Sequence, residues 1–279
     1  MIGRAKTSVT RLVARLGRHA ILFHARSLES LADLPEPIVH DHFETFVGRQ
    51  DHALGVGAAV GAQSWFVYDV DPAPHRGSGR RPDRAPDLAR DPRAPYVASI
   101  RRTFERLVSC LPGPAPVVGI VDGRLDYLAA VRTPALRSIV QLRIFPNPKR
   151  GPKRAPRSAE AIARDRAMFP VDQLHQLLRH TCADHKRERL AFGRRLESIL
   201  GRAHLMAVWK NFIKARSDRA PDRSTPAMRL GLAQTPWRWE RLLSRRLFPG
   251  RVRVSEPVLK LHRKRWTPQL PELGLRHAA

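Results

Sequence analysis

The sequence contains little cysteine and no long apolar run. Its two cysteines, Cys110 and Cys182, lie far apart, and neither belongs to a CxxC pair. A zinc ribbon therefore cannot be built from this chain, and a disulfide framework is not expected. No apolar run reaches the roughly 18 residues that a membrane-spanning helix needs, and no secretory segment opens the chain. We therefore expect no membrane partner and predict a cytoplasmic location.

Acidic residues are scarce relative to basic ones. The chain carries 51 Lys+Arg against 25 Asp+Glu, a formal net charge of +26, and its pI is near 11.6. Such an excess repels itself unless a polyanion lies nearby, which favours nucleic acid as a partner over a merely basic surface. Hydrophobic residues make up 42% of the chain, enough for a packed core.

Tyrosine is also rare, since Tyr68, Tyr96 and Tyr127 are the only ones. We interpret them as core or rim residues. No Ser, Tyr or Cys stands in the context of a covalent nucleophile, which argues against a tyrosine recombinase.

The chain divides into three regions. Residues 1–35 hold a helical stripe with Arg11 and Arg15 off the apolar face, typical of the second helix of a helix-turn-helix or of a peripheral amphipathic helix. Residues 36–217 follow the order β-β-β-α-β-α-β and then become helical, with a disordered insertion expected at 71–95. Residues 218–279 form a basic C-terminal tail. The fold class predicted for the central region is α/β, a mixed five-stranded sheet flanked by helices.

Two acids interrupt strand-like runs rather than lying among arginines in loops. Asp41 stands within IVHDHFETF, and Asp122 follows the buried-strand pattern VVGIV. Carboxylates at the rim of a sheet suit hard cations such as Mg²⁺ or Mn²⁺, although an aspartate at a strand end is also a common turn residue. A third acid is expected on a later helix; Glu188 is our assignment, and Glu197 is the competing choice.

Several strings together resemble the DDE transposases of bacterial insertion sequences, which have an RNase H-like fold. DHFETFVGRQ resembles their first-Asp segment, VVGIVDG their second-Asp strand and HKRERLAFGRR their third-acid helix, while AVWKNFIKARSDR…STPAMRLGL resembles their C-terminal segment. The likeness covers about residues 5–250. The chain lacks the zinc ribbon and the first helix of the helix-turn-helix that such proteins often carry, so an N-terminally truncated copy is one interpretation.

The resemblance implies metal-dependent nicking at the ends of a mobile element, followed by strand transfer. Two Mg²⁺ or Mn²⁺ ions would be held by Asp41, Asp122 and Glu188. Double-stranded DNA is the expected partner, with a homo-oligomer assembled on it. The alternatives are a catalytically inactive DNA-binding remnant of a transposase and another RNase H-like nuclease. The basic residues predicted to contact DNA are Arg11, Arg15, Lys149, Arg150, Lys153, Arg154, Lys186, Arg187, Lys210 and Lys214.

Overall fold

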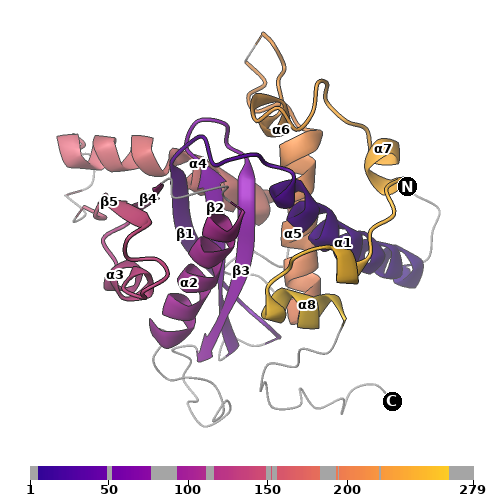
Figure 1. Cartoon of the computed structure of the whole chain (residues 1–279), viewed down its shortest axis with the longest axis horizontal. Helices are drawn as coiled ribbons and strands as arrows, with labels where there is room; N and C mark the ends of the chain where they lie inside the picture. Colours follow the sequence, from indigo (N-terminus) through magenta and orange to yellow (C-terminus); the bar gives the residue numbers. More distant parts are fainter. Residues whose placement is uncertain are drawn as a thin grey trace.

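The helices are arranged around one mixed β-sheet (Figure 1). A computed structural model describes residues 6–48, 52–76, 93–110, 116–148, 152, 156–182, 193, 195–219 and 221–263. The elements are α1 (Lys6–Glu29), β1 (Ile38–Phe46), β2 (His52–Gly61), β3 (Val67–Arg76), α2 (Arg93–Ser109), β4 (Val117–Val121), α3 (Leu125–Val131), β5 (Val140–Ile144), α4 (Ala159–Thr181), α5 (Leu196–Phe212), α6 (Pro226–Arg229), α7 (Trp239–Leu243), η3 (Pro249–Arg251) and α8 (Glu256–His262).

The sheet has the order β3-β2-β1-β4-β5. The first three strands form an antiparallel meander, whereas β4 pairs in parallel with both β1 and β5. This confirms the predicted α/β class, with the mixed five-stranded sheet and flanking helices of an RNase H-like layout. The parallel pairing brings the end of β4 beside the middle of β1.

Alternation along β1 gives the sheet two different faces. Ile38 belongs to a core cluster that includes Phe104 of α2, whereas Val39 and Phe43 belong to a second cluster with α4 and α5. In Figure 1, α2 lies in front of the sheet and α4 crosses behind it. Residues of β1 that share the side of Val39 and Phe43 therefore face α4.

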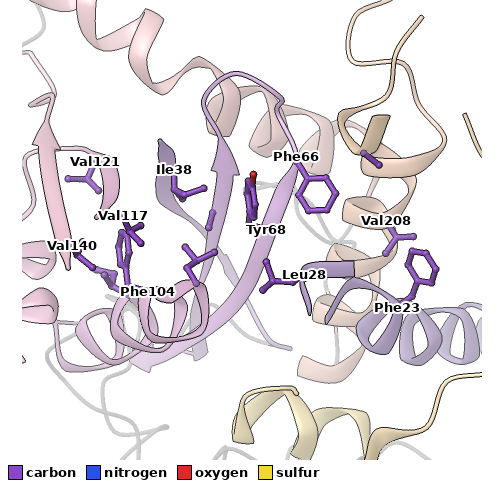
Figure 2. Packing of buried hydrophobic residues seen from close by; sticks show 14 of the residues in the cluster. Phe23, Leu28, Ile38, Phe66, Tyr68, Phe104, Val117, Val121, Val140 and Val208 are labelled. Carbon is purple, nitrogen blue, oxygen red and sulfur yellow. The ribbon is translucent and has the colours of Figure 1, made fainter. Parts of the chain in front are cut away.

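The first cluster extends beyond the sheet to the helices at its β3 edge. Figure 2 shows it running from Val140 of β5 past Ile38 and Tyr68 to Val208 of α5 and Phe23 of α1. Helix α1 therefore packs into the core over its second half, while Arg11 and Arg15 in its first half are exposed. Its interpretation as a remnant of a helix-turn-helix stays a prediction.

Two boundaries differ from the sequence interpretation. Strand β3 extends to Arg76 and α2 begins at Arg93, so the predicted loop 71–95 is wrong at both ends; residues 77–92 lie outside the described residues. Pro72 and Pro74 are accommodated because β3 is an edge strand. Residues two apart in a strand direct their backbone N–H groups to the same side, and at these positions that side has no partner strand, so the N–H that proline lacks is not needed for pairing.

The chain after residue 218 also contributes to the core. Trp237 is buried against Phe23 and Phe212, with ring centroids 5.8 and 5.0 Å away, and Leu242 and Val258 are buried too. Within the described ranges, no helix combines the length and apolar character that a membrane span requires.

Helices α1 and α5 cross where Gly17 meets Gly201. A Cβ on Gly17 would lie 2.9 Å from the Cα of Gly201, whereas a Cβ on Gly201 would lie at an ordinary 3.4 Å from the Cα of Gly17. We expect Gly17→Ala to destabilise the protein by about 1–3 kcal/mol through this overlap. The matched variant Gly201→Ala should be neutral or slightly stabilising, because alanine favours a helix. Urea denaturation of both variants tests this, and equal stabilities would contradict the close crossing.

Candidate metal centre

Asp41 lies in the middle of β1 and faces α4. Its partner across the sheet is the small residue Ala58, and its side chain remains 20% exposed. One carboxylate oxygen, Oδ1, accepts a hydrogen bond of 2.8 Å from the backbone N–H of His42. Burial, and then the negative charges of Asp122 and Asp172, raise the pKa of Asp41 to about 7, against the opposing effects of the hydrogen bond from His42 and the charge of Arg164. A carboxyl in this environment gains by binding a cation.

Asp122 follows β4 directly and comes close to Asp41. The parallel register pairs Ile38 with Gly119 and Val39 with Ile120, and two further residues along each strand lead to Asp41 and Asp122. Asp122 is largely buried. Its Oδ1 accepts from the backbone N–H of Arg124 at 3.1 Å, and its Oδ2 accepts from Asn147 Nδ2 at 3.2 Å.

Helix α4 adds an acid and an imidazole that the sequence interpretation missed. Ligand atoms of Asp41, Asp172 and His175 all lie within 4.8 Å of one another. Asp172 and His175 are three residues apart, so they lie on one side of the helix, beside the buried Val171 and Leu174 that pack on the sheet. The Asp-x-x-His spacing on an amphipathic helix was the available signal, but spacing alone does not show which side of a helix meets the sheet.

His175 has the protonation state that a metal ligand needs. Burial, and then the charge of Arg179, lower the pKa of His175 to about 3, so the ring is neutral. Its Nδ1 lies 3.9 Å from Asp41 Oδ2, and its buried Nε2 has no hydrogen-bond partner in the described part of the chain. Two carboxylates and one neutral imidazole fit a divalent ion, and the nitrogen favours Mn²⁺ over Mg²⁺.

A polar chain connects the two sides of this site. Arg164 forms an ion pair with Asp172 at 2.5 Å and donates from Nε to Asn147 Oδ1 at 3.0 Å. Asn147 in turn donates to Asp122, so residues after β4, after β5 and on α4 are held together. This arrangement orients the carboxylates before any ligand enters.

Asp41 and Asp172 open onto a cleft of about 440 Å³ along α4, whereas Asp122 is not among the residues that line it. Asp41, Phe169, Asp172 and His175 line it, together with Arg179. The carboxylates of Asp41 and Asp172 lie at its wall, so a divalent ion held there would be accessible from the cleft.

The third acid predicted from sequence, Glu188, lies outside the described residues and stays a prediction. The competing Glu197 lies in the first turn of α5, 3.8 Å from Arg195, and lines a groove between α1 and α5 instead.

The predicted DNA contacts differ in their positions. Lys210 is only 5% exposed and donates to the carbonyl of Trp65 at 2.9 Å, so it is an interior lysine. Lys214 is more accessible and lies 3.2 Å from Asp218. Arg11 and Arg15 are exposed on α1. The other basic residues of this prediction lie outside the described residues: Lys149, Arg150, Lys153, Arg154, Lys186 and Arg187.

Comparison with protein-family models, with curated proteins and with solved structures finds no match to this chain.

Proposed function

We propose that this chain is a divalent-metal-dependent enzyme that nicks DNA and transfers the cut strand, a transposase of the DDE, RNase H-like kind. The proposal rests on the group of Asp41, Asp172 and His175 at one rim of an RNase H-like sheet, with Asp122 near enough to Asp41 to raise the pKa of that carboxyl. The sequence resemblance and the net charge of +26 support the same conclusion.

Each residue has a definable part in this chemistry. Asp41 and Asp172 offer oxygen ligands, His175 offers a neutral nitrogen, and Asp122 offers a further carboxylate beside Asp41. Bound divalent ions, two by resemblance, supply Lewis-acid stabilisation of the charge on a phosphate that undergoes in-line displacement. Arg164 holds Asp172, and through Asn147 it also holds Asp122.

The DNA would be held mainly through its phosphates. Arg11 and Arg15 expose two cations on α1, and the basic residues predicted from sequence supply more. Since such contacts carry no base information, they favour binding to any duplex, at a strength that falls with salt. Strand transfer joins two element ends to one target, so we expect a homo-oligomer on DNA.

Nicking of supercoiled plasmid in Mn²⁺ tests the proposal. We expect the protein to nick and EDTA to stop the nicking. Asp122→Asn should reduce the nicking rate by at least about 100-fold, because replacing even a residue that only orients a metal ligand lowers metal affinity or activity 10–100-fold. Glu160→Gln, an exposed acid in the first turn of α4, is the matched control and should retain the parent rate.

Three outcomes would redirect the assignment. DNA binding without nicking by the parent would identify a non-catalytic DNA-binding remnant. Nicking with no preference for element ends, or a preference for branched junctions, would identify another RNase H-like nuclease. An Asp122→Asn variant as active as the parent would show that this rim is not the active site.

A further inference from the structure

A second cavity, of about 220 Å³, adjoins the acidic cleft. It lies between α4 and the C-terminal end of α5, and its lining includes Lys210, Lys214 and Arg216 on one side and His180 on the other. Gln176 of α4 lines both cavities. A ligand strand in the acidic cleft can therefore continue into the basic cavity without leaving α4.

Trp65 organises the cations of this cavity. It occupies the turn between β2 and β3 with a φ of 62°, a backbone conformation that residues other than glycine rarely adopt. The hydrogen bond from Lys210 to the carbonyl of Trp65 helps to hold this conformation. The guanidinium of Arg216 stacks 4.5 Å from the centre of the indole ring. The indole also meets Phe169, whose ring centre lies 5.3 Å away and which lines the acidic cleft. Trp65 therefore contacts cations of the second cavity and an aromatic ring of the acidic cleft.

The cations in this cavity exceed the acids around them. Asp218 lies 3.2 Å from Lys214, and Asp222 acts on Arg216 from a greater distance. Burial, and then the charges of Lys214 and Arg216, lower the pKa of Lys210 to about 7. The buried Nε of Arg216 has no hydrogen-bond partner among the described residues. An anion in the cavity would complete this donor set.

We propose that the cavity of Lys210, Lys214 and Arg216 binds one backbone phosphate of the DNA strand whose neighbouring phosphate enters the acidic cleft. This inference rests on the proposed function and adds the path of the strand. A guanidinium beside an ammonium is the donor set that a phosphodiester accepts, and such a contact fixes the register of the strand.

Binding of a fluorescein-labelled DNA duplex without metal, in EDTA, tests this proposal. We expect Lys214→Ala/Arg216→Ala to weaken binding at least about tenfold, since hydrogen bonds to charged groups are the strong ones. The slope of log K against log salt should become shallower by about 0.9, the value for one lost phosphate contact. The matched control is Arg251→Ala/Lys260→Ala, which removes two cations from η3 and α8. It should keep the parent slope, because distant charges are screened beyond about 10 Å at 0.1 M salt.

A charge-conserving exchange separates phosphate contact from packing. Lys214→Arg/Arg216→Lys should restore most of the affinity and the parent slope, whereas failure to restore them would assign the loss to packing and overturn the proposal. If Lys214→Ala/Arg216→Ala kept the salt dependence of the parent protein, the proposal would be overturned as well. Because no metal or cleavage is involved, a parent that binds through this cavity yet fails to nick would reject the proposed function and keep the phosphate site.

Discussion

Replacing Asp172 by asparagine is expected to weaken Mn²⁺ binding, and with it nicking, by at least about 100-fold. Asp172 is the acid that α4 presents to Asp41, and its ligand atom lies within 4.8 Å of those of Asp41 and His175. Asparagine keeps the shape and one oxygen but removes the negative charge that a hard cation requires. The loss should therefore exceed the 10–100-fold typical of a residue that only orients a ligand.

Glu188, the third acid predicted from sequence, is the residue to compare with Asp172. Glu188→Gln should leave Mn²⁺ affinity within a few-fold of the parent if α4 supplies the acid. Glu160→Gln removes a carboxylate from the same helix at an exposed position and controls for net charge. A large loss in Glu188→Gln together with parent behaviour in Asp172→Asn would return the third position to the helix predicted from sequence.

Lowering the pH from 7 to 5 is expected to remove several kcal/mol from the free energy of unfolding. Burial lowers the folded-state pKa of His24 to about 4 and that of His40 to about 3. Burial, complete for His204 and partial for His42, also places the pKa values of these two histidines well below 6.5. Below pH 6.5 these histidines bind protons in the unfolded chain but not in the folded protein, so stability falls as the pH falls through 6.5. Each such histidine contributes about 2 kcal/mol at pH 5, against a typical total of 5–15 kcal/mol.

Two buried carboxyls oppose this loss of stability in acid. Burial raises the folded-state pKa of Asp41 to about 7 and raises that of Asp71. The folded protein therefore gains a proton at Asp41 below pH 7 that the unfolded chain does not bind, which offsets about one histidine. Asp41→Asn removes this offset, so its stability should fall more steeply with acid. Urea midpoints between pH 8 and pH 5, measured without divalent ions, test both expectations; a midpoint that does not change between pH 7 and pH 5 would contradict them.

The sheet was predictable because its strands have distinct periodicities. The alternation around Asp41 and the apolar run before Asp122 indicated two strands with a carboxylate each, and the element order indicated a mixed sheet. The edge strand β3 was partly missed because Pro72 and Pro74 normally mark loops, and only the tertiary position of the strand makes them acceptable.

The α4 half of the site could not be predicted in the same way. Asp172 and His175 stand in a helix rich in charged residues, and local sequence does not reveal which side of that helix meets β1. Their role depends on the parallel step from β1 to β4 and on the packing of α4 behind the sheet. The interior position of Lys210 is likewise a tertiary effect, since the carbonyl that it contacts belongs to a turn far away in sequence.

Titration of the unmodified protein with Mn²⁺, followed by the electron paramagnetic resonance signal of the free ion, tests the central claim most directly. At pH 8, above the raised pKa of Asp41, we predict saturable binding that Asp41→Asn and Asp172→Asn each abolish and that Glu160→Gln leaves unchanged. Unsaturable binding by the parent protein, or the same affinity in all four proteins, would show that Asp41, Asp172 and His175 do not form a metal centre.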